Sequence, residues 1–280
     1  MKLAVIGHVE HVTIGNVMAL PAPGEITHLE RPRVFPGGGG GVAFYQLLRG
    51  PAEMLLFTAL GDDDAGTFVE ANLATTGARV FAARRAQPHT RDVVMVTPGG
   101  QRTIIVIGEP LHPKRSDPLP WDELATCDAA YFTAQDPDAL RAARAAKLLV
   151  VTARRREALV KSGVIADVVV GSLGDPREAS TLADYPNRPR AIVLTDGARG
   201  GQIETREGIT HFAPSRPPTS IVGSYGAGDS FAGALVYFLA TGSSATGIAG
   251  LALEAATRAA AYGAAVLASL IPLDAQLSLY

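Results

Sequence analysis

The chain has 280 residues, of which 47% are apolar and 19% charged, and its formal net charge is −2. This is the composition of an ordinary globular protein, and it lacks the strongly basic balance expected of a nucleic-acid binder. The single cysteine, Cys127, excludes a disulfide within the chain and a zinc site built on cysteines, so we expect a reducing, cytoplasmic location.

We expect neither a leader nor a membrane partner. The first apolar run ends at Gly7, which makes it too short for the apolar core of a signal peptide. The sequence contains no run of about 18 apolar residues, the length that a transmembrane helix needs.

Short, continuous apolar runs recur along the chain and predict strands buried on both faces, as in a parallel sheet. The runs are KLAVIG (2–7), MLLFTALG (54–61), AAYFTA (129–134), KLLVVTA (147–153), ADVVVGS (166–172) and AIVLTDG (191–197). Helical stretches lie between them, among them 65–77, 137–146 and 155–163. This alternation predicts one doubly wound α/β domain over residues 1–280, with ligands at the carboxyl ends of the strands.

Two segments interrupt the alternation. Residues 8–35 contain PAPGE, and residues 89–107 read HTRDVVMVTPGGQRTIIVI. The second segment predicts a hairpin that turns at TPGGQ, between two arms rich in β-branched residues. We expect the two segments to form a small β appendage on the main sheet.

A glycine run, 37–41, precedes a predicted helix. It lets the backbone approach a ligand closely, or it is a flexible loop without a partner. The Gly-Lys-Ser/Thr of a P-loop is missing, and the first strand ends without GxGxxG, so a Walker-type ATPase and a nicotinamide dehydrogenase are not favoured. The three acids of TALGDDDAG (58–66) are either metal ligands or a helix cap.

GAGDSFAG (226–233) begins a long apolar segment with the composition of a helix. Free N–H groups of Gly226, Ala227 and Gly228 at a helix start attract an anion, and Asp229 in the same turn suits a general base acting on a hydroxyl. Alternatively, Asp229 or Ser230 only caps the helix. A hydrolase with Ser230 as nucleophile is disfavoured: GDSF is similar to the GDSL of certain lipases, whose motif lies near the N-terminus.

Taken in order, these segments resemble the ribokinase-like (PfkB) family of carbohydrate and nucleoside kinases. The matching features are the first strand ending in Gly, PAPGE, the glycine-rich helix start, ALGDDDAG, the hairpin, ADVVVGS, VLTDGARGG and GAGDSFAG. The resemblance spans nearly the whole chain. It implies a mostly parallel sheet sandwiched by helices, a small β lid over the sugar site, and ATP with Mg²⁺ along the strand ends.

The resemblance also implies residue roles. Asp229 matches the catalytic base, and the amides of Gly226, Ala227, Gly228 and Asp229 match an anion hole for the γ-phosphoryl group. The nucleotide side would be formed by Ser172, Asp175, Thr195, Gly197, Gly200 and Ala264, and Asp175 would place Mg²⁺ through water. The substrate side would be formed by Glu10, His11, Gly38, Gly39, Gly40, Gly41, Arg91 and Asp229.

The chain departs from the family where sugars and cations are held. Gly223-Ser224 replaces the usual Asp-Thr, which puts a monovalent-cation site in doubt, and Gly41 stands for the usual Asn. Val12 stands for a sugar-binding Asp, with Glu10 or His11 as substitutes, and Ser172-Leu173-Gly174-Asp175 replaces Asn-x-x-Glu.

These observations predict an ATP- and Mg²⁺-dependent kinase for a hydroxyl of a sugar, a sugar derivative or a nucleoside. The alternative is a kinase-like protein that binds a nucleotide or sugar without turnover. The family resemblance also implies a homodimer formed through the β lid.

Overall fold

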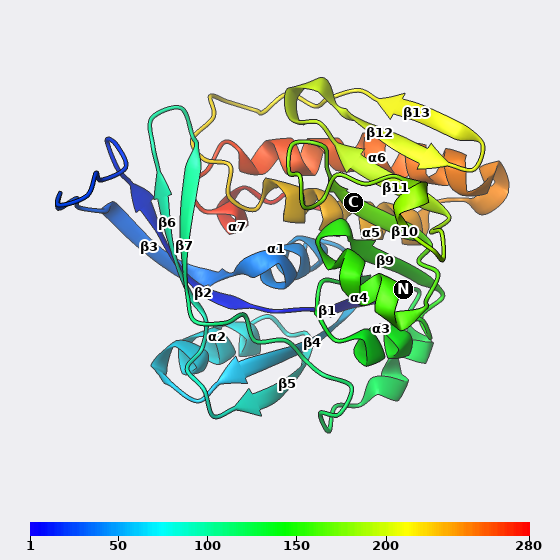
Figure 1. Ribbon diagram of the computed structural model, residues 1–280, viewed down its shortest axis with the longest axis horizontal. Coiled ribbons are helices and arrows are strands. Elements are labelled where there is room, and N and C mark those ends of the chain that lie inside the picture. The colour runs from blue at the N-terminus through cyan, green and yellow to red at the C-terminus, as the bar shows by residue number, and fades with distance from the viewer.

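The computed structural model describes residues 1–280, the side chain of Ser244 excepted. Its main sheet has nine strands in the order β13-β12-β11-β10-β9-β8-β1-β4-β5 (Figure 1). The seven strands from β11 to β5 in this order pair in parallel, β12 pairs antiparallel with β11, and β13 pairs antiparallel with β12. The strands are β1 (Lys2–Ile6), β4 (Glu53–Gly61), β5 (Arg79–Arg85), β8 (Ala129–Phe132), β9 (Leu148–Thr152), β10 (Val168–Ser172), β11 (Ala191–Thr195), β12 (Gly201–Thr205) and β13 (Gly208–Phe212). The predicted mostly parallel α/β sheet is confirmed.

Helices cover both faces of this sheet, because its strands are apolar on both sides. One face packs against α1 (Gly38–Leu47), α2 (Asp64–Ala74), α5 (Ala227–Thr241) and α6 (Gly247–Val266), and the other against α3 (Pro137–Ala143) and α4 (Arg156–Ser162). Leu3 and Val5 of β1 pack in the core on the first face, and Ala4 and Ile6 pack in the core on the second. The short α7 (Pro272–Ala275) follows α6.

A smaller sheet stands at one end of the main one (Figure 1). Its order is β3-β2-β6-β7, formed by β2 (Glu10–Asn16), β3 (Glu30–Gly37), β6 (Arg91–Val96) and β7 (Arg102–Ile107). β6 and β7 pair antiparallel, and Thr97 and Gln101 close the turn through a 3.0 Å backbone hydrogen bond. The predicted hairpin at TPGGQ is therefore confirmed.

The structure decides between the alternatives that the sequence left open for the glycine run and for the acidic run. The helix α1 begins at Gly38, so most of the glycine run forms its first turn and is not a loop. In the acidic run, Asp63 accepts a hydrogen bond from the Gly66 N–H and caps α2, which is the second of the two alternatives for those acids. No helix in the described part of the chain is long and apolar enough to cross a membrane.

Candidate active site

The helix α5 begins with a turn in which Gly228 is exposed. Gly226 precedes it in the left-handed region, with φ 77°, and a Cβ there would lie 3.0 Å from the side chains of Pro272 and Val42. At Gly228 a Cβ would meet no atom within 4 Å. No described side chain caps this helix start, so the capping alternative for Asp229 and Ser230 is not what the structure shows. The amides are thus free to bind an anion.

Asp229 faces the start of another helix. A Cβ built on Gly39 of α1 would lie 3.2 Å from Asp229 Oδ1 and 3.5 Å from Thr133 Oγ1, just past the end of β8. Only glycine at position 39 leaves this space open. The carboxylate, the α1 glycine and the strand end therefore border one small space at the carboxyl edge of the sheet.

The surroundings of Asp229 raise its pKa to about 6. Burial is the main cause, the negative charge of Glu178 adds to it, and the positive charges of Arg102 and Arg154 oppose it. A carboxylate with a pKa near neutrality is well matched to accepting a proton at physiological pH. The structure thus places a carboxylate of raised pKa in the first turn of α5, beside backbone amides that no described side chain caps.

Glu10, the first residue of β2, and His8, in the short connection between β1 and β2, border the same space. A Cβ on Gly38 would lie 2.9 Å from Glu10 Oε2, and the Gly39 N–H donates to His8 Nε2 at 3.3 Å. Glu10 is buried, and its carboxyl lies close to the buried carboxyl of Asp92 on β6. Burial first, and then the charge of Asp92, raise the pKa of Glu10 well above its usual range, so the two acids hold one proton between them.

The other residues predicted for the substrate lie elsewhere. His11 packs edge-on against Phe68 of α2, with ring centroids 5.0 Å apart, and Arg91 forms an ion pair with Asp63 at 2.9 Å. Gly40 packs on the backbone of Gly7 and His8, and Gly41 on Val9. Val12, which replaces the family's Asp, is buried in the core of the small sheet. The structure therefore gathers Glu10, Gly38, Gly39 and Asp229.

The residues predicted for the nucleotide follow the ends of β10 and β11. Ser172 and Thr195 are register partners across these strands, and Gly197 and Gly200 shape the next turn with φ of 54° and 87°. Ala264 lies in α6 next to Gly263. A Cβ added at Gly263 would lie 3.0 Å from the Ala227 carbonyl oxygen, so this part of α6 packs closely on the start of α5. Ser172, Thr195, Gly197 and Gly200 thus follow two neighbouring strand ends, and Ala264 lies beside the start of α5.

Asp175 has partners that the sequence did not predict. Its carboxylate pairs with Arg154 at 2.6 Å and also accepts the Arg177 N–H at 2.9 Å. Arg154 pairs in turn with Glu178 at 2.6 Å. The charges of Glu178 and Arg154 both act on the pKa of Asp229, and no sequence motif marked either residue. The sequence could have pointed to Arg154, because a run of arginines directly follows β9 and ligands of α/β sheets bind at the carboxyl ends of the strands.

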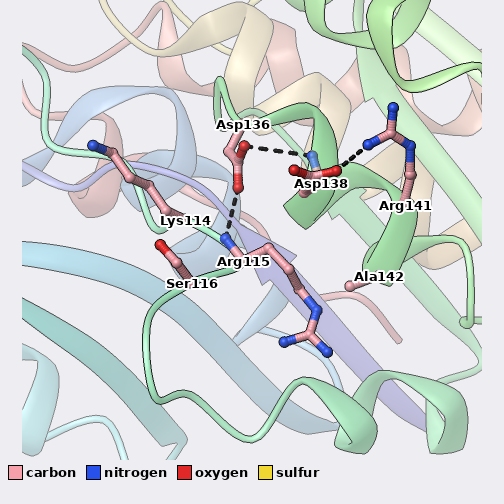
Figure 2. Close-up of a pocket in the computed structure, with 7 residues that line it drawn as sticks. All are labelled: Lys114, Arg115, Ser116, Asp136, Asp138, Arg141 and Ala142. Carbon is pink, nitrogen blue, oxygen red and sulfur yellow. Dashed lines mark hydrogen bonds and ion pairs between the residues drawn. The ribbon is translucent and has the colours of Figure 1, made fainter.

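A pocket lies beside the loop that follows β7. It is lined by Lys114, Arg115, Ser116, Asp136, Asp138, Arg141 and Ala142, and Figure 2 shows Asp136 accepting the Arg115 N–H while Asp138 pairs with Arg141. Most of its polar groups are already bonded to one another. It is open to solvent and is separate from the cluster around Asp229.

A family model for the pfkB family of carbohydrate kinases matches residues 1–169 and 164–270 of the chain. The chain belongs to this family. A pfkB kinase implies ATP as the phosphate donor. A search of curated proteins found no match to the sequence.

Solved structures of pfkB-type kinases share the fold. The ribokinase of Thermotoga maritima is 18% identical with a TM-score of 0.78, over 100% of this chain and 97% of its own. The ribokinase of Giardia lamblia is 16% identical with a TM-score of 0.80, over 99% and 96%. Phosphofructokinase-2 of Escherichia coli is 14% identical with a TM-score of 0.73, over 95% and 92%.

Proposed function

We propose that this pfkB kinase transfers the γ-phosphoryl group of ATP to a hydroxyl of a sugar, a sugar derivative or a nucleoside. The observation that carries the proposal is the position of Asp229, whose Oδ1 borders the space above Gly39 while the open amides of Gly226 to Asp229 begin the same helix. A base and an anion site thus meet at one point.

In the proposed reaction, Asp229 takes the proton of the acceptor hydroxyl. The acceptor oxygen forms a bond to the γ-phosphorus, and the bond between that phosphorus and the β-γ bridging oxygen breaks, which gives ADP and the phosphorylated acceptor. The amides of residues 226–229 and the positive end of α5 stabilise the charge on the transferring group. Such positioning and charge stabilisation account for most of the catalysis in phosphoryl transfer.

We further propose that ATP lies along Ser172, Thr195, Gly197, Gly200 and Ala264, with Mg²⁺ bound mainly by phosphates and water. Within the described side chains, no group of three or more His, Cys, Asp or Glu is arranged to hold a metal, and Mg²⁺ in kinases needs only one or two carboxylates. Asp175 and Glu178 are the acids on this side, and because both pair with Arg154 they would reach the ion through water.

Two alternatives are less well supported. Ser230 is fully buried and its Oγ lies 3.2 Å from Gln276 Nε2, which makes it a packing residue and not a nucleophile. A kinase-like protein without turnover would not need an ionisable group at position 229, where desolvation disfavours the charged form of the carboxylate.

The test is ADP formation from MgATP across a panel of sugars, sugar acids, sugar phosphates and nucleosides, together with a thermal-shift screen of the same compounds. We expect one class to give turnover that requires Asp229. Binding of panel members without any ADP formation, at saturating MgATP, would favour the silent alternative instead.

We also propose that the protein acts in the cytoplasm and forms a homodimer through the small sheet. The edge strand β7 exposes Ile104, Ile105, Val106 and Ile107, which are 38%, 51%, 49% and 51% exposed. An edge strand with consecutive exposed β-branched residues readily pairs with another strand.

A further inference from the structure

Arg155 carries a charge that has no carboxylate partner. It follows β9 next to Arg154, but the two side chains turn to opposite sides: Arg154 reaches Asp175 and Glu178, whereas Arg155 Nε donates to the Thr133 carbonyl at 2.9 Å. Its NH2 group lies 3.3 Å from His112 Nε2. Among the described residues, no acid lies within ion-pair distance of Arg155, although its side chain is largely enclosed. An enclosed guanidinium without a counter-charge is destabilising, so binding of an anion beside it would be favourable.

The two histidines beside it present further donors. The Arg155 guanidinium can only donate, so His112 Nε2 accepts, and His8 Nε2 accepts from Gly39. Burial lowers the pKa of His8 to about 3 and that of His112 to about 2, so both rings are neutral and carry their proton on Nδ1. Their ring centroids are 4.9 Å apart.

Both Nδ1–H groups lack a partner within the described structure. His8 is 9% and His112 7% exposed, and each Nδ1 is buried without a hydrogen bond. The Thr133 carbonyl is near enough to His8 to raise its pKa, but it accepts the Arg155 Nε–H and forms no hydrogen bond of acceptable geometry with His8 Nδ1. Unmet buried donors are uncommon in native proteins and often mark a ligand site.

We propose that His8, His112 and Arg155 form a subsite for an anionic group of the acceptor, a carboxylate or a phosphate, so that the substrate is an acidic sugar derivative. The proposal rests on the proposed function, because it assumes that the acceptor hydroxyl lies at Asp229. The Gly39 Cβ position, 3.2 Å from Asp229 Oδ1, lies 3.6 Å from His8 Cε1, so the base and the subsite border the same space.

The chemistry of the donor set decides between an anion and a hydroxyl. Arg155 and the two Nδ1–H groups only donate, whereas a sugar hydroxyl must also donate its own proton. A carboxylate or phosphate only accepts, and it also offsets the guanidinium charge. The acids nearby do not offset that charge in full, because Glu10 shares a proton with Asp92 and Asp229 lies across the space as the base.

The experiment compares matched acceptors that differ in charge. Ribose, ribonate and ribose 5-phosphate, and the corresponding hexose series, are assayed with MgATP for kcat/KM and by thermal shift. We expect the acidic member of a pair to be preferred, with one of the two anion classes favoured. Arg155→Met should lower the acid-to-neutral ratio of kcat/KM by about 10- to 100-fold, the worth of hydrogen bonds to a charged group, and leave the KM for ATP unchanged.

Two further variants keep the test decisive. His112→Phe removes the Nδ1–H at similar shape and should lower the same ratio by about 3- to 10-fold, even if Arg155→Met folds poorly. Arg84→Met is the control, because Arg84 is a half-exposed arginine that pairs with Glu70 on the far edge of the sheet, and it should leave the ratio unchanged.

The outcomes separate this inference from the proposed function. Acids that stabilise the parent but not Arg155→Met, without ADP formation, support the subsite and contradict the kinase assignment. Turnover of neutral acceptors with no preference for acids overturns the subsite alone. The subsite is also overturned if no acid binds, or if Arg155→Met raises the KM for ATP and affects acidic and neutral acceptors equally.

Discussion

Arg102 of β7 donates a hydrogen bond to Ser224 Oγ at 3.2 Å, and Ser224 Oγ donates to the Gly100 carbonyl at 3.0 Å. This pair of bonds ties the tip of the small-sheet hairpin to the segment that leads into α5. The same link brings the Arg102 charge close enough to Asp229 to lower its pKa. The hairpin therefore contributes to the electrostatics of the proposed base.

We expect Arg102→Gln to move the pH profile of kcat/KM. Loss of the positive charge lets the pKa of Asp229 rise further, so the acid limb should shift to higher pH. Ser224→Ala keeps the Arg102 charge but removes the hydrogen bond that holds it in place, so its acid limb should shift in the same direction by a smaller amount. Measured pH profiles check both variants, and an unshifted limb in Arg102→Gln would contradict the coupling.

Asp229→Asn should lower turnover by about two to four orders of magnitude, the range for loss of a general base, with little change in nucleotide affinity. The parent should lose kcat/KM below about pH 6, where Asp229 becomes protonated. Steady-state kinetics and nucleotide titration check this, and near-normal turnover of the variant would remove Asp229 from the mechanism.

The same variant should be more stable than the parent at neutral pH. The raised pKa of Asp229 means that the protonated acid favours the fold and that this contribution is lost as the pH rises through about 6. Asparagine cannot ionise, so thermal unfolding should show a higher Tm for the variant above pH 6 and convergence toward pH 4.

Gly228→Val should abolish phosphoryl transfer in a folded protein. A Cβ at position 228 meets no atom within 4 Å, so the side chain fits, but it blocks the approach of a phosphate to the amides. Gly226→Ala is the contrasting variant, because φ is 77° there and Pro272 is 3.0 Å away, and it should lower the Tm as well. Circular dichroism and activity together distinguish the two, and full activity of Gly228→Val would place the anion hole elsewhere.

Glu10→Gln should lower kcat/KM for the acceptor, whereas His11→Ala and Arg91→Ala should change it less than about threefold. Glu10 borders the space at Gly38, while His11 and Arg91 contact Phe68 and Asp63. Surface substitutions away from a site usually have small effects. Kinetics on the acceptor found by screening decide the question, and equal losses in all three variants would contradict this division.

Ile105→Lys should dissociate the proposed dimer. The exposed side chain lies on the edge strand β7, and a charge there disfavours strand pairing. Ile209→Lys on β13, the edge of the main sheet, is the matched control because Ile209 is 57% exposed. Sedimentation velocity checks the assembly, and a parent protein that is monomeric at all concentrations would rule the dimer out.

The sequence predicts the centre of this fold better than its edges. Strands such as β4 and β10 are apolar on both faces, so a continuous run marks them. β5 and the β12–β13 hairpin lie at the edges of the sheet, where exposed and buried residues are mixed, and no run marks them. The sequence pattern also does not predict the helix α6. Its many small residues pack against several neighbouring elements, so no single apolar stripe marks the helix in the sequence.

The site shows the same division. Asp229 and the glycines of α1 lie in local motifs and are found from the sequence alone. Glu178, Arg154, His8 and His112 come from separate elements, and only their packing brings them to one place. Glu10 lies between these two cases. The sequence indicates Glu10 or His11 as a substrate residue, and only the structure shows that their side chains point to opposite faces of β2.

The pairing of β2 with β6 also bears on how the molecule folds. These strands are parallel, with His11 opposite Arg91, so β3, α1, β4, α2 and β5 all lie between them in the chain. Contacts between such distant residues form only after a large loss of chain entropy, which slows their formation. The small sheet should thus consolidate after β1 and β4 have paired, and Glu10 should reach Asp92 late. Refolding followed by hydrogen exchange would then show protection of β2 and β6 lagging behind that of β1, with catalytic competence regained last.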